Sequence, residues 1–455
     1  MSVFDGRRLS PEVFQLDVER LPRGWYSDKY FLNIAHLLAD LAKAGYTFAG
    51  EAPSDVDARV ARDAHIGDIE VEMQVFTRRQ PFSVVAGVDE ALAILQAATG
   101  YYDGDDRFVN TYDRLEVEAA RDGVRVPYGG DPREVRPVLR IRGRYRDFAV
   151  LETPILGALT EATRVATNVY EVLTAAGGKD VLFFPARFAH YKLQALHGYA
   201  YSLAVQAYDQ EHGGHSRRGI STDEQGAWWG GHGGGTIAHS AIACFLGDTA
   251  ETMVEFCRYQ PVDIPRVALV DFHNDCVGTT LRVMARLFPL YLAALRTGDK
   301  GEAARYRLNG VRPDTGGTLR DVSVTPLGDK RLDCGVNPRL VHNLRRAIDE
   351  AWRDWSVPFE WLDEARAWCR AVKIVVTGGF SPEKIRRFEE LAVPVDVYGV
   401  GSWLLSNSDA DGTNNDYTAD IVRVKLDGAW VDMAKVGRHR GENPLLEKVD
   451  TGQRT

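Results

Sequence analysis

The sequence has few of the residues that stabilise small secreted domains. Its 455 residues include five cysteines, with no Cys-x-x-Cys pair and no regular spacing: Cys244, Cys257, Cys276, Cys334 and Cys369. Neither a zinc knuckle nor a disulfide framework is therefore expected. No apolar stretch approaches the ~18 residues of a membrane span, and the stretch from Met1 to Arg7 lacks the apolar run of a secretory signal. These absences predict a cytoplasmic protein that works without a membrane.

A surplus of positive charge is also missing. The net charge is -9, which gives no overall attraction for nucleic acid, so an anionic substrate must be bound by local basic groups. Hydrophobic residues make up 45% and charged residues 26%, as in ordinary globular proteins, which excludes a fibrous or largely disordered chain. The nucleophile-elbow, Walker and Rossmann patterns are absent as well, which removes the commonest hydrolase, P-loop and nicotinamide-dependent classes.

Apolar, strand-like runs with polar ends dominate the last two hundred residues. Four of them end at an acidic residue or a glycine pair: Val267–Val270 before Asp271, Val311–Asp314 before Thr315-Gly316-Gly317, Ile374–Val376 before Thr377-Gly378-Gly379, and Val395–Val397 before Gly399-Val400-Gly401. Most are followed by a helical pattern. Parallel strands that alternate with helices bring their carboxyl ends to one rim, where α/β barrels keep their chemistry. The pattern therefore predicts an enzyme.

The same alternation predicts the domains. Residues 1–150 contain a helix near 27–45 and strand-like runs at 69–76, 82–88, 109–119 and 135–143, which indicates an α+β domain. A long helix from Thr153 to about Ala175 opens a barrel that spans residues 151–409. Strand-like runs at 421–426 and 429–433 lead us to expect that residues 410–455 return to the first domain. The predicted fold is α/β, an irregular TIM-like barrel with an N-terminal α+β domain completed by the C-terminal tail.

The segment Gln210–Gly235 is the least regular part of the chain. It holds nine glycines together with His212, His215 and His232. Its histidine spacing matches no zinc pattern. Long segments of this kind are either functional loops or disordered, and the composition leaves both interpretations open.

Glycines and charged residues at the strand ends are the candidates for anion binding. Glycine lets backbone N–H groups approach a phosphate, and two glycine-rich strand ends lie where such barrels bind phosphate. The alternative is that each glycine only forms a tight turn. An arginine can clamp a phosphate, while carboxylates can hold Mg²⁺ or ribose hydroxyls. An ion pair within the rim is the alternative interpretation. The residues concerned are Gly378, Gly379, Gly399, Gly401, Arg312, Asp314 and Asp271.

Two earlier segments add candidates for the same rim. His239 follows the glycine-rich run 233–235 and precedes an apolar helix, so it is either catalytic or a core or cap residue. Arg187 lies where a strand passes into a helix, and its guanidinium would suit a carboxylate. Phe184, three residues earlier, offers a ring face to a flat aromatic ligand.

From Asp28 to about Gly437, the chain resembles the nicotinate phosphoribosyltransferases, which are type II phosphoribosyltransferases. The resemblance is carried by the order and spacing of several motifs: Asp28-Lys29-Tyr30-Phe31, Leu151-Glu152-Thr153-Pro154, Ala186-Arg187-Phe188-Ala189-His190, Gly235-Thr236-Ile237-Ala238-His239-Ser240, Pro265-Arg266-Val267-Ala268-Leu269-Val270-Asp271, Val311-Arg312-Pro313-Asp314-Thr315-Gly316, Thr377-Gly378-Gly379 and Tyr398-Gly399-Val400-Gly401-Ser402.

The resemblance implies a reaction and its partners. Nicotinate and phosphoribosyl pyrophosphate would give nicotinate mononucleotide and pyrophosphate, with Mg²⁺ as cofactor and ATP hydrolysed as a co-substrate. A head-to-tail homodimer with shared active sites is implied, with Tyr30 lent by the neighbouring subunit. The alternatives are a related enzyme for nicotinamide or another base, and a noncatalytic relative that binds phosphoribosyl ligands.

The resemblance also implies roles for individual residues. His239 matches the histidine that ATP phosphorylates, and Arg187 and Phe184 match residues around the pyridine ring. The remaining matches concern the phosphoribosyl half. Arg312, Asp314 and Thr315 would meet ribose and pyrophosphate, Asp271 and Asp314 the metal, and Gly378, Gly379, Gly399 and Gly401 the 5′-phosphate.

Overall fold

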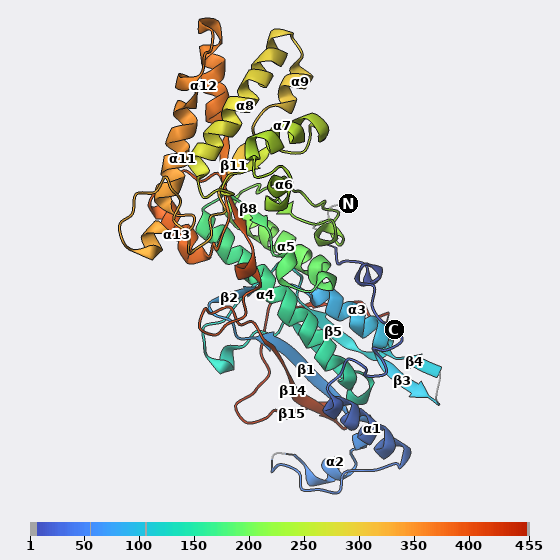
Figure 1. Cartoon of the computed structure of the whole chain (residues 1–455). Helices are drawn as coiled ribbons and strands as arrows, with labels where there is room; N and C mark the ends of the chain where they lie inside the picture. Colours follow the sequence, from blue (N-terminus) through green and yellow to red (C-terminus); the bar gives the residue numbers. More distant parts are fainter. Residues whose placement is uncertain (1–6, 55, 105–106, 453–455) are drawn as a thin grey trace.

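Two six-stranded sheets organise the chain (Figure 1). The computed structural model describes residues 7–54, 56–104 and 107–452. The prediction that Met1–Arg7 is no secretory signal falls mostly on residues 1–6, which lie outside the described residues. The first sheet has the order β15-β14-β1-β7-β5-β16, and the second has the order β10-β11-β12-β13-β8-β9. Every strand pair of the second sheet is parallel. The predicted α/β fold class is confirmed.

The first sheet is antiparallel and joins both ends of the sequence. Strand β1 pairs with β7 from the N-terminal part on one side and with β14 from the tail on the other. Val75 of β1 is paired with Leu139 and with Ala419. The elements of this part are α1 (Lys29–Lys43), α2 (Ala58–Arg62), β1 (Glu70–Thr77), β2 (Phe82–Val84), α3 (Val88–Ala98), β3 (Gly100–Asp103), β4 (Arg107–Asn110), β5 (Glu116–Ala119), β6 (Arg125–Pro127), β7 (Leu139–Arg144), β14 (Tyr417–Leu426), β15 (Ala429–Asp432) and β16 (Glu447–Lys448).

One strand expected in this domain is interrupted. The run 109–119 contains β4 and β5, separated by a short 3₁₀ turn at Tyr112–Arg114. The side chain of Asn110 accepts a hydrogen bond from the backbone N–H of Tyr112 (2.9 Å), and Tyr112 is buried. Local hydrogen bonding of this kind favours turns over strands, so the prediction of one continuous strand was wrong.

A buried carboxylate ties the tail to the first sheet. Glu72 on β1 is fully buried and forms ion pairs with Arg142 of β7, Arg423 of β14 and Arg440. Burial alone would raise its pKa, but the hydrogen bonds from Arg423 and Arg142 hold the pKa of Glu72 at about 2. Removing one partner of such a buried network is strongly destabilising.

Helix α4 (Glu152–Ala176) contributes to two hydrophobic cores. Ile155 and Leu159, near its start, pack with the residues of the first sheet. Val165 and Val169, about two to four turns later, pack with those of the second sheet. In Figure 1, α4 runs through the middle of the molecule beside α5. This shared helix therefore fixes the second sheet relative to the first.

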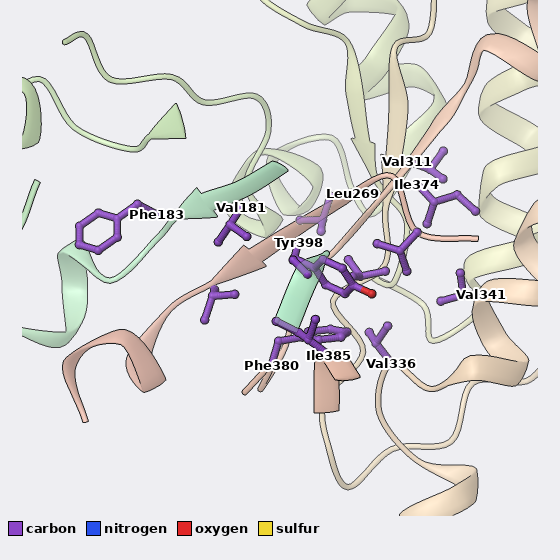
Figure 2. Packing of buried hydrophobic residues seen from close by; sticks show 14 of the residues in the cluster. Val181, Phe183, Leu269, Val311, Val336, Val341, Ile374, Phe380, Ile385 and Tyr398 are labelled. Atoms are coloured by element: carbon purple, nitrogen blue, oxygen red, sulfur yellow. The ribbon is translucent and has the colours of Figure 1, made fainter. Parts of the chain in front are cut away.

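The second sheet is a curled half-barrel covered by helices. Leu269, Val311 and Ile374 from three adjacent strands are fully buried in its core (Figure 2). Its elements are β8 (Asp180–Phe183), α5 (Gln194–His212), β9 (Gly219–Ile220), α6 (His239–Cys244), α7 (Thr249–Tyr259), β10 (Val267–Leu269), α8 (Cys276–Arg296), α9 (Lys300–Arg305), β11 (Gly310–Arg312), α10 (Lys330–Asp333), α11 (Pro338–Glu350), α12 (Leu362–Ala371), β12 (Lys373–Val376), α13 (Pro382–Glu390) and β13 (Val397–Val400).

One barrel strand begins and ends later than the sequence pattern suggested. The expected strand at 395–397 is β13, which spans Val397–Val400, so Gly399 lies inside the strand opposite Leu182. The prediction that Gly399 belongs to a loop after the strand was therefore wrong. A glycine within a strand often marks a place where another group approaches the backbone closely.

The glycine-rich segment 210–235 has a defined structure. Helix α5 extends to His212, β9 adds a short parallel strand to β8, and Gly233 forms a bridge with Ile220. Gln225 is fully buried, and its Oε1 accepts hydrogen bonds from the backbone N–H groups of Ser221 and Thr222. No helix of the described ranges is long and apolar enough to cross a membrane.

Candidate active site

The carboxyl ends of β10, β11, β12, β13 and β8 meet along one rim because these strands are parallel neighbours. Asp271 lies two residues after the end of β10, and Asp314 two residues after the end of β11. Thr377 follows β12 directly, and Phe184 follows β8. The polar and aromatic residues that the sequence pattern predicted at the strand ends are therefore gathered at one edge of the sheet.

His239 and Asp271 form a contact at this rim. His239 is the first residue of α6, and its Nε2 lies 3.1 Å from Oδ1 of Asp271. The histidine side chain is 46% exposed, whereas the aspartate side chain is 10% exposed. Burial raises the pKa of Asp271, the charge of His239 opposes that rise, and Asp314 adds to it. The two carboxylates follow neighbouring parallel strands, because Leu269 of β10 lies opposite Arg312 of β11.

Arg312 and Asp314 occupy the centre of the rim. Nη2 of Arg312 donates to the carbonyl oxygen of Ile237 (3.1 Å), and Nη1 lies 3.9 Å from Oδ2 of Asp314. The hydroxyl of Thr377 donates to Oδ1 of Asp314 (2.7 Å) and so fixes the carboxylate. Burial lowers the pKa of Arg312. The charges of Asp314 and Asp271 oppose that shift, and the charge of Arg187 adds to it. Arg187 therefore belongs to the same electrostatic cluster.

Arg187 has a free guanidinium. It lies in a 3₁₀ turn at Ala186–Phe188, just after β8, and its side chain forms no hydrogen bond or ion pair with any residue of the described ranges. Cζ of the guanidinium lies 5.2 Å from the centroid of the Phe188 ring. An exposed arginine beside an aromatic ring is suited to a flat carboxylate ligand.

Two phenylalanines pack against the glycines of Gly399-Val400-Gly401. A Cβ atom at Gly399 would lie 3.1 Å from the ring of Phe184 and 2.6 Å from Cγ2 of Thr377. A Cβ atom at Gly401 would lie 2.8 Å from the ring of Phe188. A side chain at either glycine would therefore force a neighbouring side chain to shift. Their assignment to the 5′-phosphate stays a prediction.

Gly378 and Gly379 form a turn with unused backbone donors. Their φ angles are +95° and +65°, in the left-handed region that favours glycine. Within the described residues, the N–H groups of Gly378, Gly379 and Phe380 donate no hydrogen bond. A Cβ atom at Gly378 would lie 3.4 Å from Oδ1 of Asp314, so this turn borders the central carboxylate. Successive free amides of this kind are suited to bind an anion.

Two predicted residues do not place their side chains at this rim. Thr315 is buried, and its hydroxyl lies 3.5 Å from Sγ of Cys276 in the interior. Tyr30 lies on α1 in the other domain, where it is 62% exposed and its hydroxyl donates to Oδ2 of Asp28 (3.2 Å). The backbone N–H of Asp28 in turn donates to the hydroxyl of Thr153 (3.0 Å). Two motifs that lie far apart in the sequence thus meet on one surface.

Sequence reasoning missed the parts played by Thr377, Phe188 and Lys384. Thr377 was recognised only as part of a glycine motif, although a threonine that ends a barrel strand next to an Asp-bearing strand end is a signal for a carboxylate partner. Phe188 follows Arg187 directly and shields the Gly401 backbone. Lys384 follows Gly378 by six residues, on the helix that the turn opens, and its Nζ donates to the carbonyl oxygen of Gly378.

Comparison with known proteins gives consistent results. The family described as "Quinolinate phosphoribosyl transferase, N-terminal domain" matches residues 55–163. The nicotinate phosphoribosyltransferase pncB1 of Mycobacterium tuberculosis is 23% identical over 373 residues, which cover 79% of this chain and 68% of that protein.

Two solved structures have a similar fold. A nicotinate-nucleotide pyrophosphorylase from Pyrococcus furiosus aligns with a TM-score of 0.59 and 22% identity, covering 96% of this chain and 85% of that one. Human nicotinic acid phosphoribosyltransferase aligns with a TM-score of 0.52 and 17% identity, covering 88% of this chain and 74% of that one. The fold is that of the type II phosphoribosyltransferases. Within that class, the chain is similar to a nicotinate phosphoribosyltransferase over 79% of its length.

Proposed function

We propose that this protein transfers the phosphoribosyl group of phosphoribosyl pyrophosphate to nicotinate, giving nicotinate mononucleotide and pyrophosphate in NAD salvage. The observation that carries the proposal is the grouping of Arg187, which has no ionic partner among the described residues, with Arg312 and the carboxylates of Asp271 and Asp314. A receptor for a carboxylate thus lies beside groups suited to ribose, pyrophosphate and a metal ion.

The reaction requires charge stabilisation more than proton transfer. The pyridine nitrogen of nicotinate attacks C1 of the ribose with its lone pair while the bond from C1 to the pyrophosphate oxygen breaks. Positive charge develops on the sugar and negative charge on the leaving group, and fixed charges aimed at both lower the barrier. The carboxylate of Asp314, held by the hydroxyl of Thr377, offers negative charge to the positive charge that develops on the sugar. Arg312 offers positive charge to the negative charge that develops on the pyrophosphate.

Asp271 and Asp314 are the residues that would hold Mg²⁺. Mg²⁺ prefers oxygen ligands and usually combines one or two carboxylates with waters and substrate phosphates. Asp271 and Asp314 supply two carboxylates of this kind at neighbouring strand ends. The described ranges contain no group of three or more His, Cys, Asp or Glu residues suited to hold a metal ion. The remaining ligands would come from the substrate and water. When bound, the ion would neutralise charge on the pyrophosphate.

His239 is the proposed acceptor of a phosphoryl group from ATP. With Nε2–H donating to Asp271, Nδ1 carries the lone pair and can attack the γ-phosphorus while ADP leaves. The side chain is exposed enough to meet a nucleotide. The resulting phosphoryl group would stand at the same rim as Arg312 and would organise pyrophosphate and Mg²⁺.

A head-to-tail homodimer is proposed to complete the site. One exposed apolar set lies on the N-terminal domain: Val18, Trp25, Tyr26, Tyr30 and Leu37. A second exposed set borders the rim: Phe188, Tyr191, Leu193, Phe245 and Leu246, the last of which is 97% exposed. Exposed apolar groups of this kind mark interaction surfaces, and a head-to-tail contact would cover both sets and bring Tyr30 to the partner's rim. A cytoplasmic location stays a prediction from the sequence.

Turnover with different bases tests the proposal. Nicotinate, nicotinamide and quinolinate are each supplied with phosphoribosyl pyrophosphate, ATP and Mg²⁺, and mononucleotide formation is measured by chromatography. We expect nicotinate to be used best because Arg187 offers its charge to a carboxylate. Absence of activity on nicotinate, with activity on another base, would support the related-enzyme alternative; absence with every base would support a noncatalytic relative.

A further inference from the structure

Lys384 lies beside the glycine turn and has no acidic partner among the described residues. It belongs to α13, and its Nζ donates to the carbonyl oxygen of Gly378 (3.1 Å). Within the described ranges it forms no ion pair. Acidic groups on nearby elements have other partners: Glu389 forms an ion pair with Lys179, and Asp314 lies beside Arg312 and accepts a hydrogen bond from Thr377. A partly buried lysine that has no carboxylate partner carries a positive charge that a bound anion would neutralise.

The ammonium group is held on a rigid aromatic platform. Nζ of Lys384 lies 4.1 Å from the centroid of the Phe380 ring. Phe380 is buried and packs edge-on against Phe388 (5.1 Å) and next to Tyr398 (5.5 Å). Figure 2 labels Phe380 and Ile385 among the buried residues of this core. The ring and the carbonyl together fix the position of the charge.

The contact with Gly378 also orients a peptide group. In a trans peptide, the C=O and N–H bonds point in opposite directions. Because the carbonyl oxygen of Gly378 faces Lys384, the N–H of Gly379 points away from the lysine. That N–H donates to no described residue, and the position of a Cβ atom at Gly379 has no neighbour within 4 Å. The turn is thereby held open with a free donor.

We propose that Lys384 is a positioning residue for the 5′-phosphate of the phosphoribosyl substrate, acting through the Gly378–Gly379 peptide that it holds in place. The inference rests on the proposed function, because it concerns the same site. The chemical group recognised is a phosphate monoester dianion. The neighbouring pyrophosphate is the other source of phosphate oxygens in this reaction, and it belongs to the side of the rim with Arg312.

The ionisation of Lys384 gives a signature for this role. Burial lowers the pKa of Lys384 to about 8 and is the one cause of the shift. The positive charge is therefore complete below pH 7 and is lost as the pH rises through 8. Phosphate is already a dianion above pH 7, so its own ionisation does not produce a change in that range. An arginine in the same place would keep its charge at every pH used.

Binding of ribose 5-phosphate and of inorganic pyrophosphate to the full-length protein tests the proposal by calorimetry. We expect Lys384→Met to weaken ribose 5-phosphate binding about tenfold, as for loss of a charge-assisted contact, and to change pyrophosphate binding less than threefold. The KM for phosphoribosyl pyrophosphate should rise by a similar factor, while the KM for nicotinate stays unchanged. Lys384→Arg should restore binding, and Lys300→Met, at an exposed lysine of α9, is the matched control.

Wild-type protein provides a second measurement if Lys384→Met does not fold. Its affinity for ribose 5-phosphate should fall between pH 7 and pH 9.5, whereas that of Lys384→Arg should stay level. A level wild-type profile, or a folded Lys384→Met protein with unchanged ribose 5-phosphate binding, overturns the proposal. A larger effect on pyrophosphate than on ribose 5-phosphate also overturns it. These measurements need no base and no turnover, so failure of the proposed function shows separately, as absence of product.

Discussion

Nε2 of His239 lies 3.1 Å from Oδ1 of Asp271, with the histidine half exposed and the aspartate nearly buried. The exposed partner can meet a substrate, and the buried partner can fix its ring and support positive charge on it. Such a pair is a means of activating a histidine that receives a phosphoryl group. Burial raises the pKa of Asp271, which its contact with His239 opposes. The two residues therefore act as a unit, and changing either one tests the same step.

Replacing His239 by alanine should abolish coupled ATP hydrolysis and leave ribose 5-phosphate binding intact. Asp271→Asn should reduce ATP hydrolysis about a hundredfold, since it removes the charge that stabilises the histidine. Release of ADP with and without the other substrates is the measurement. Unchanged ATP hydrolysis in His239→Ala would refute the role given to this histidine.

Arg187→Ala should weaken nicotinate binding selectively. Its guanidinium has no ionic partner among the described residues, so its removal leaves no buried carboxylate unpaired and the fold should persist. We expect the KM for nicotinate to rise more than about tenfold, as for loss of a charge-assisted pair, with a change below threefold for phosphoribosyl pyrophosphate. Steady-state kinetics with each substrate varied in turn decides this. Equal effects on both KM values contradict the assignment, and Arg366→Ala on α12 is the control.

The barrel and the carboxyl-end rim were predictable because strand ends carry a local signal. Asp271, Arg312 and Asp314 follow apolar runs, and parallel pairing alone brings them together. The place of Gly399 was not predictable in the same way. A short valine-rich run does not say where a strand begins, and the close approach of Phe184 that requires a glycine comes from another strand.

Contacts between segments that are distant in the sequence could not be predicted either. The hydroxyl of Thr377 holds Asp314 across a strand pair, and Lys384 reaches back to Gly378 from the next helix. Neither pairing follows from periodicity, since each depends on the register of two neighbouring elements. Thr315 belongs to a predicted site motif, but its side chain is buried, which the motif alone did not reveal.

Mixing two variants that are each impaired at low nicotinate concentration should restore activity at that concentration if subunits share their sites. Tyr30→Ala alters the N-terminal domain and Arg187→Ala alters the rim. In a head-to-tail dimer of one subunit of each kind, one site has both native residues, so random mixing gives about one quarter of wild-type activity. Coexpression with two different tags and an activity assay tests this. A mixture of Arg187→Ala with Arg312→Ala should not recover, and failure of the first mixture to recover contradicts a shared site.

Gly399→Ala should disturb Asp314 through Thr377. The added Cβ atom would lie 2.6 Å from Cγ2 of Thr377, whose hydroxyl donates to Asp314. We expect the free energy of unfolding to fall by about 1–3 kcal/mol, as for overpacking in a core, and kcat to fall as well. Chemical denaturation and turnover are measured together. Gly317→Ala, where a Cβ atom meets nothing within 4 Å, should leave the stability unchanged, and equal stability of both variants would contradict the packing argument.

Glu90→Gln should change how stability depends on pH. Oε2 of Glu90 is buried without a hydrogen-bond partner among the described residues, and burial raises the pKa of this carboxyl from 4.5 to about 7. The folded protein thus keeps a proton that the unfolded chain releases, so stability falls as the pH rises from 4.5 to 7 and stays lower above it. Because the amide carries no charge, the variant should be more stable than the wild type by about 2 kcal/mol at pH 8.5. At pH 4 the two should differ little. Urea denaturation at both pH values, with the exposed Glu51→Gln as control, measures the difference, and an equal effect of Glu90→Gln at both values would show that its carboxyl is ionised without cost in the folded protein.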